Sequence, residues 1–188
     1  MNFLAFTLKL KQRTNVIQTP LGISELLPEN ENIDPNNDPR IFNTLGIWDT
    51  GATGSAITES TAQSLGLEPI GFQQVQFGSG IQVCKEYLVN FYLPNRSLIR
   101  NVKVTECANI AGGVGALIGM DVITLGDFVV TNQNNETTVS FRIPSLETID
   151  YVKSWNKAFY KDAKRNDKCR CGSGKKFKDC HEPLLKLK

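Results

Sequence analysis

An acidic residue at the end of an apolar run is the first feature of this sequence that could carry out chemistry. Asp49 lies in the stretch GIWDTGATGSAI, and Thr50 and Gly51 follow it directly. Glycine frees the backbone for a tight turn in which N–H groups can approach a carboxylate. A carboxyl group held in this way can act as a general acid or base. Asp-Thr-Gly alone is a weak signal, so a turn-forming or helix-capping aspartate in an ordinary β protein is the alternative interpretation.

A second group of chemically active side chains lies near the carboxyl end, in CRCGSGKKFKDCH. Its members are three cysteines and the only histidine of the chain: Cys169, Cys171, Cys180 and His181. The glycines between the cysteines permit a sharp chain reversal, and three thiolates with one imidazole match a closed tetrahedral zinc site. Because no coordination position stays open, the zinc is expected to be structural. Reduced surface cysteines on a basic tail are the alternative.

Length and composition exclude several classes of protein. The chain has 188 residues, of which 40% are hydrophobic and 21% charged, as in a folded globular protein. The net charge of +2 is too small to indicate a nucleic-acid partner by itself. An odd number of cysteines argues against a disulfide framework. Cys84 and Cys107 are expected to be buried strand residues, and the sequence gives no support for redox control through them.

The first residues, MNFLAFTLKLKQRT, place basic residues after a short apolar run. This is the reverse of the order in a signal peptide, and no segment has transmembrane length. We therefore expect a cytoplasmic location and no membrane partner.

Short strands broken by glycine or asparagine dominate the first three quarters of the chain. They are rich in β-branched and aromatic residues, often in alternation, and are expected at 6–12, 41–48, 72–77, 81–93, 98–107, 127–131 and 137–143. Two short helices are expected at 57–66 and 120–126. The polar, Pro- and Asn-rich segment at about 27–40 predicts an exposed loop insertion. The fold class is therefore mainly β.

Beyond Pro144 the pattern changes to apolar residues at spacings of three and four, which are Leu146, Ile149, Val152, Trp155 and Phe159. This stripe predicts an amphipathic helix. We expect three parts: residues 1–143, a helix and linker at 144–166, and the cysteine-rich segment at 167–188.

The acid motif and two later segments resemble the retroviral-type (retropepsin-like) aspartic protease family. They are WDTGATGSAI at 48–57, VQFGSGIQV at 75–83 and GALIGMDVI at 115–123. The resemblance implies a retropepsin-like acid protease barrel with short helices at 1–143. It implies that Asp49 is the catalytic acid and base, that Thr50 braces the two loops across a dimer, and that Gly51 lets the substrate backbone approach. The tip of a substrate-binding flap would be Gly78, Ser79 and Gly80.

Only one Asp-Thr-Gly occurs in the chain. The family resemblance implies a homodimer, in which each subunit supplies one aspartate to activate water for hydrolysis of a peptide or protein substrate. Two departures stand out. Met120 replaces an arginine that often pairs across viral dimers, and Trp48 is bulkier than the usual residue before the acid.

The cysteine-rich segment resembles the SEC-C motif at the carboxyl end of the bacterial SecA translocase, which contacts the SecB chaperone and the ribosome. The resemblance implies a structural zinc module that recruits a ribosome or chaperone partner. A charged rim around a folding element is the alternative. Two other functions stay open: a catalytically silent peptide-binding protein, and an adaptor that acts mainly through the zinc module.

Overall fold

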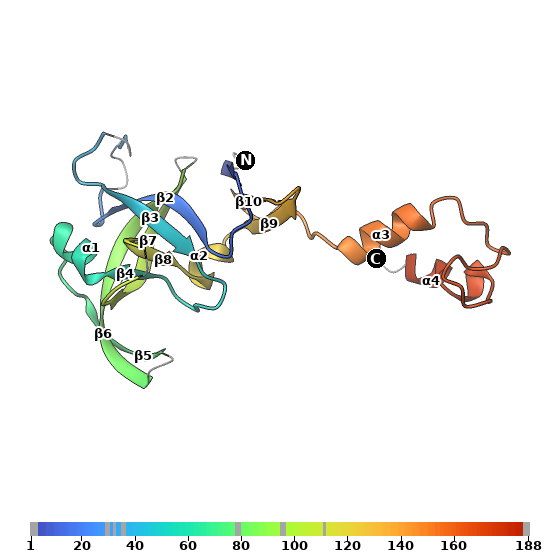
Figure 1. The fold of residues 1–188 in the computed structure, drawn as a ribbon. Coiled ribbons are helices and arrows are strands. Elements are labelled where there is room, and N and C mark those ends of the chain that lie inside the picture. The colour runs from blue at the N-terminus through green and yellow to red at the C-terminus, as the bar shows by residue number, and fades with distance from the viewer. Residues whose placement is uncertain are drawn as a thin grey trace. The chain divides into compact units, whose positions relative to one another are not determined.

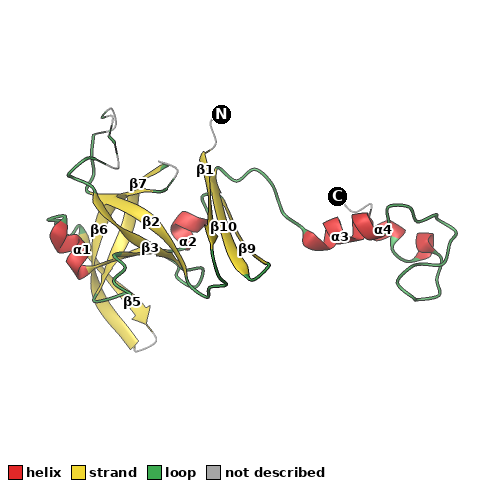
Figure 2. Cartoon of the chain, turned by 45° about the horizontal axis from the view of Figure 1, so that its top comes forward, coloured by secondary structure: helices red, strands yellow, loops and turns green. Residues whose placement is uncertain are grey.

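The computed structural model describes residues 4–28, 31, 33–34, 37–77, 80–94, 97–110 and 112–185. The chain divides into two compact units, Met1–Leu146 and Glu147–Lys188. Each unit is described by itself below (Figures 1 and 2). Among the described residues, no helix is both long and apolar enough to cross a bilayer.

The first unit is built mainly of strands. They are β1 (Leu4–Leu10), β2 (Ile17–Ser24), β3 (Phe42–Trp48), β4 (Ala56–Thr58), β5 (Gly71–Phe77), β6 (Gly80–Tyr92), β7 (Leu98–Cys107), β8 (Ala116–Ile118), β9 (Asp127–Gln133) and β10 (Glu136–Ile143). Two short helices, α1 (Glu59–Ser64) and α2 (Met120–Ile123), lie at the places predicted from the sequence. Thr58 caps α1 by accepting a hydrogen bond from the Thr61 N–H.

Seven of these strands form a barrel. Their order is β2-β3-β8-β4-β7-β6-β5, and β2 also pairs with β6 and so closes the sheet. Most neighbours are antiparallel, but β3 runs parallel to β8 and β4 runs parallel to β7. The short strand β8 thus lies between β3 and β4 and brings residues 116–118 beside residues 46–48. The arrangement places the end of β3 next to the start of α2.

The remaining strands form a separate three-stranded sheet of order β1-β10-β9, which packs on the barrel through aromatic side chains. Trp48, the last residue of β3, is 6% exposed and stacks on Phe128 at a centroid distance of 4.9 Å. It also contacts Phe6 and Phe141, and its indole N–H donates to the Thr19 hydroxyl at 3.0 Å. The bulk of Trp48, unusual for the family that the sequence resembles, therefore fills the contact between the two sheets.

Substitution Trp48→Ala is expected to destabilise this unit by about 3–5 kcal/mol, because it removes a buried aromatic side chain from the contact between the sheets. Denaturant unfolding followed by circular dichroism measures the change. Trp155→Ala is the matched control: that side chain is 66% exposed, so its loss should change stability by less than about 0.5 kcal/mol. Similar effects of the two substitutions would contradict the assignment.

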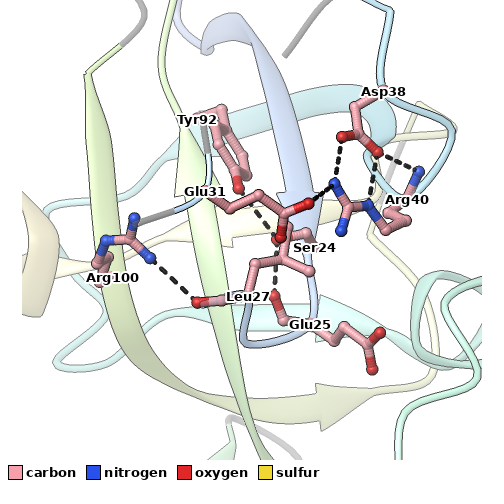
Figure 3. A network of polar contacts seen from close by, with 8 residues as sticks. All are labelled: Ser24, Glu25, Leu27, Glu31, Asp38, Arg40, Tyr92 and Arg100. Carbon is pink, nitrogen blue, oxygen red and sulfur yellow. Dashed lines mark hydrogen bonds and ion pairs between the residues drawn. The ribbon is translucent and has the colours of Figure 1, made fainter. Parts of the chain in front are cut away.

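The loop between β2 and β3, predicted as an exposed insertion, is joined to the barrel by polar contacts at its start and is braced by ion pairs within the loop near its end (Figure 3). At its start, Ser24 lies within hydrogen-bond distance of the buried Tyr92 hydroxyl, and Arg100 donates to the carbonyl of Leu27 at 3.3 Å. At its end, Arg40 forms ion pairs with Glu31 and Asp38 at 2.7 and 2.6 Å. Hydrogen bonds from Arg40 lower the pKa of Asp38 to about 2.

The second unit contains α3 (Tyr151–Phe159), a single 3₁₀ turn η1 (Phe177–Asp179) and α4 (Glu182–Leu185) around a small core. The predicted apolar stripe begins at Leu146, but α3 begins only at Tyr151. The reason is that the Asp150 carboxylate accepts a hydrogen bond from the Lys153 N–H and caps the helix there. No residue of α3 is buried. The core of this unit is instead formed by Tyr160, Cys169 and Phe177.

Candidate functional site

The geometry around Asp49 follows from the pairing of β3 with β8. Trp48 lies opposite Ile118 in this parallel pair, and the Asp49 N–H continues it by donating to the Ile118 carbonyl at 2.9 Å. β3 is also paired along its length with β2. The backbone of Asp49 is therefore fixed at the end of a central strand, while its side chain is only half-buried in the single chain.

The chain turns sharply after this aspartate. The Gly51 N–H donates to the Asp49 carboxylate at 2.8 Å, and the Ala52 N–H donates to the Asp49 carbonyl at 3.3 Å. A side chain at position 51 would place its Cβ 3.2 Å from that carboxylate oxygen, so the glycine leaves room beside the acid. Thr50 is exposed on the same turn. The turn orients one oxygen of the carboxylate and leaves the approach to it open.

The segment that follows β8 lies behind this loop, which we call the acid loop (residues 49–55). The Met120 N–H donates to the Ala52 carbonyl at 2.8 Å, and the Asp121 N–H donates to the Thr53 carbonyl at 3.2 Å. The Ser55 hydroxyl donates to the Asp121 carboxylate at 2.8 Å and accepts from the Gly119 N–H at 3.0 Å. These four hydrogen bonds join two segments that lie more than sixty residues apart in the sequence.

The close approach of Gly119 to the acid loop requires a glycine. A Cβ at this position would lie 2.5 Å from the backbone carbon and oxygen of Gly54, a distance that real side chains do not adopt. Gly119→Ala should therefore push the loop away and lower stability by about 1–3 kcal/mol. It should also reduce any activity that depends on Asp49.

Gly54→Ala is the matched control for this substitution, because a Cβ at position 54 meets nothing within 4 Å. Thermal unfolding and peptide cleavage of both variants make the comparison. Equal behaviour of Gly119→Ala and Gly54→Ala would show that the contact between the two segments does not matter.

Asp121 supports the acid loop and the start of α2. One oxygen of its carboxylate accepts the Ser55 hydroxyl and also the Val122 N–H, at 3.0 Å, in the first turn of α2. Met120, which replaces the arginine expected from viral relatives, is partly buried and packs against the main core. Sequence reasoning missed Ser55. Its position between Gly54 and a short strand was the only signal.

The segment predicted to be a flap lies in the β5–β6 hairpin, which extends beyond the barrel (Figure 1). Its strands pair from Gly71↔Glu86 to Phe77↔Gly80. Gly80 has φ +124°, a conformation that favours glycine. Gly78 and Ser79, the other two predicted tip residues, lie outside the described residues. Phe72, Ile81 and Val83 are all more than 60% exposed on this hairpin, so it presents apolar side chains for a further contact.

The predicted metal ligands are brought together in the second unit. The sulfurs of Cys169, Cys171 and Cys180 and a ring nitrogen of His181 all lie within 4.8 Å of one another. His181 Nδ1 lies 3.3 Å from the Cys169 sulfur and 3.2 Å from the Cys180 sulfur. This donor set could hold one metal ion in the tetrahedral arrangement that thiolates and imidazole give to zinc.

Backbone turns and an aromatic stack position these ligands. Gly172 and Gly174 have φ of +81° and +73°. The chain reverses between Cys169 and Lys175, and the Cys169 N–H donates to the Lys175 carbonyl at 2.8 Å. The Tyr160 ring stacks on the His181 ring at 4.9 Å. Hydrogen bonding from Ser173 lowers the pKa of Cys171 to about 6. Cys171 therefore favours the thiolate form that binds metals, whereas burial and the neighbouring cysteines raise the pKa of Cys180.

Comparison with known proteins found one sequence motif and several solved structures similar to this chain. The SEC-C motif matches residues 165–183. Among solved structures, a retropepsin-like aspartic protease from Rickettsia conorii is 14% identical, with a TM-score of 0.45, and the match covers 76% of this chain and 96% of that one. The simian foamy virus protease is also 14% identical (TM-score 0.38; 57% of this chain and 91% of that one). The retroviral protease-like domain of Ddi1 from Leishmania major is 14% identical as well (TM-score 0.34; 72% and 96%). No curated protein matches the chain.

The fold class predicted from the sequence is confirmed. The topology is a mainly β barrel with short helices, and a C-terminal helix and a small Cys/His module with a SEC-C motif follow it.

Proposed function

We propose that the protein is an aspartic endopeptidase that acts as a homodimer. The observation that carries the proposal is the geometry of the acid loop. Asp49 is fixed by its backbone at the end of a central strand, its carboxylate is oriented by the Gly51 N–H, and the Gly119 segment supports the loop from behind. An aspartate needed only for a turn would not require this support from a distant segment.

A second carboxylate completes the chemistry. Two aspartates that share a proton can divide the work: one takes a proton from water while the other gives a proton to the peptide carbonyl oxygen. The sequence contains a single Asp-Thr-Gly, so the partner group is Asp49 of a second copy related by a twofold axis. In this proposal Thr50 braces the two loops, Gly51 makes room for the substrate backbone, and the hairpin with Gly78, Ser79 and Gly80 at its tip covers a peptide or protein substrate.

The Cys/His module is proposed to hold one structural Zn²⁺ through Cys169, Cys171, Cys180 and His181. All four donors come from the protein, so no position is left for a substrate or water. The ion would cross-link the chain segments of a unit that has a very small core. The module, with the exposed apolar residues of α3 beside it, is proposed to contact a ribosome or chaperone in the cytoplasm.

Cleavage of a diverse peptide pool from pH 4 to 8, measured over a range of protein concentrations, tests the proposal. A dimeric enzyme should lose activity faster than linearly on dilution, because the subunits separate. Activity strictly proportional to concentration down to the lowest measurable level would contradict assembly of the site from two chains.

A catalytically silent peptide-binding protein is the second candidate, favoured by the exposed apolar side chains of the β5–β6 hairpin. Such a protein would bind an extended peptide as an additional strand of its sheet and would hold alternate side chains of the peptide in pockets. Peptide binding without turnover at every pH would support it. An adaptor acting mainly through the zinc module is the third, and loss of partner binding in Cys180→Ser, with the barrel intact, would support that function.

A further inference from the structure

Cys84 and Cys107 occupy facing positions where the β5–β6 hairpin separates from the barrel. The antiparallel ladder of β6 and β7 pairs Tyr87 with Val104 and Glu86 with Thr105. Continued by two residues, this register sets Cys84 directly opposite Cys107. Directly opposed residues point to the same face of a sheet. The β6–β7 ladder ends at Glu86 and Thr105, while β6 continues along β5 on its other edge and β7 continues along β4 on its other edge.

The hydrogen bonds around this point identify the kind of pair. The Thr105 N–H donates to the Ser55 carbonyl, next to β4, and the Glu86 carbonyl accepts from the Ile70 N–H, next to β5. The backbone groups of Glu86 and Thr105 therefore point away from each other, which makes them a non-hydrogen-bonded pair. Since the two kinds of pair alternate along an antiparallel ladder, continuing this ladder past its last pair, Glu86 and Thr105, puts Cys84 and Cys107 at the next non-hydrogen-bonded positions.

This kind of position suits a disulfide. Cα atoms of non-hydrogen-bonded pairs lie about 4.5 Å apart with their side chains close together, and disulfides join Cα atoms about 4.4–6.8 Å apart. The ion pair between Lys85 and Glu106, at 3.1 Å, shows that the strands are still adjacent at the intervening position. Burial raises the pKa of the Cys107 thiol to about 11, and the charge of the nearby Cys84 thiolate contributes to the same rise in pKa.

We propose that Cys84 and Cys107 form a reversible cross-strand disulfide that ties the root of the β5–β6 hairpin to β7 when the protein meets a low-molecular-weight disulfide. The half-buried Cys107 thiolate attacks one sulfur of that molecule and releases one thiolate. The buried Cys84 thiolate then attacks the Cys107 sulfur and releases the second. Two protein thiols are oxidised and one small disulfide is reduced to two thiols, with no net change in protons.

The link would restrict the hairpin at the point where it leaves the barrel. In a protease the hairpin must open for a substrate to enter, so the oxidised protein should cleave peptides more slowly than the reduced protein. This consequence rests on the proposed function, whereas formation of the disulfide does not.

The first test uses the full chain with its bound metal and oxidised glutathione as the probe. After treatment, free thiols are blocked with N-ethylmaleimide, and the digested protein is mapped by mass spectrometry. The expected product is a peptide containing Cys84 joined to a peptide containing Cys107, lighter than the two reduced peptides by two hydrogen atoms. Both residues carrying the blocking group or glutathione, or a link from either to the cysteines of the Cys/His module, would overturn the proposal.

Hydrogen exchange and cleavage complete the test, with Cys84→Ser and Cys107→Ser as matched controls. Oxidation should slow amide exchange in residues 71–86 of the wild type and leave it unchanged in both variants. It should lower peptide cleavage only in the wild type. A linked peptide with unchanged exchange and cleavage would overturn the restriction of the hairpin. A linked peptide without cleavage in either redox state would instead contradict the proposed function.

Discussion

Asp49→Asn is expected to abolish peptide cleavage while leaving the fold intact. The amide is nearly the same size as the carboxyl group and can still accept the Gly51 N–H, so the acid loop should keep its shape. It can neither take a proton from water nor share one with a second copy. General acid–base groups contribute about 10²–10⁴-fold each, and the substitution removes both members of a symmetric pair at once. We therefore expect a loss of at least about 10³-fold in kcat.

The informative comparison is Asp121→Asn. Asp121 is a second carboxylate that contacts the acid loop, but it already accepts the Ser55 hydroxyl and the Val122 N–H. The Asp121→Asn substitution should lower the unfolding temperature and still allow cleavage. Steady-state kinetics and thermal unfolding of the two variants separate the roles. Cleavage that survives in Asp49→Asn, or that disappears only in Asp121→Asn, would show that the wrong aspartate has been assigned.

The sequence was informative where a residue type has only one physical use. The segment GALIGMDVI at 115–123 was identified through its resemblance to the family, and the structure gives the physical reason for its glycine: only glycine allows the close approach that Gly119 makes to Gly54. The gathering of Cys169, Cys171, Cys180 and His181 could be predicted because cysteine and histidine rarely occur together on a short polar segment without a shared role. Seven strands could be predicted from alternation and from β-branched and aromatic residues, since one buried face of a sheet imposes alternation, but β2, β4 and β8 were not predicted.

Features that depend on long-range packing could not be predicted. The sequence shows Trp48 as an oddity before the acid, and only the structure shows that it fills the contact with β1, β9 and β10. The apolar stripe of α3 predicts a helix that starts earlier, because periodicity does not reveal that Asp150 caps it. The pairing of Cys84 with Cys107 depends on the register of two strands, which neither residue's neighbours in the sequence disclose.

Removal of the metal is expected to unfold the second unit and leave the first unchanged. The core of the second unit consists of Tyr160, Cys169 and Phe177 with a few partly buried neighbours, too little apolar surface to hold a folded chain of this length by itself. Structural zinc sites contribute about 10–16 kcal/mol of binding free energy in small domains, and this energy is also folding energy. A chelator should therefore abolish the dispersed amide signals of residues 160–185 in an NMR spectrum.

Cys180→Ser should have the same effect without a chelator. Loss of an outer-shell partner of a metal ligand already costs about 10–100-fold in affinity, so loss of a ligand itself should cost more. Cys107→Ser is the matched control, because it makes the same chemical change in the other unit and should retain one bound Zn²⁺ per chain. Metal content by atomic emission and amide dispersion are the two measurements. A second unit that stays folded without metal would mean that Tyr160, Phe177 and the hydrogen bonds around Cys169 suffice to hold it, and the Cys/His cluster would then need a role other than a structural one.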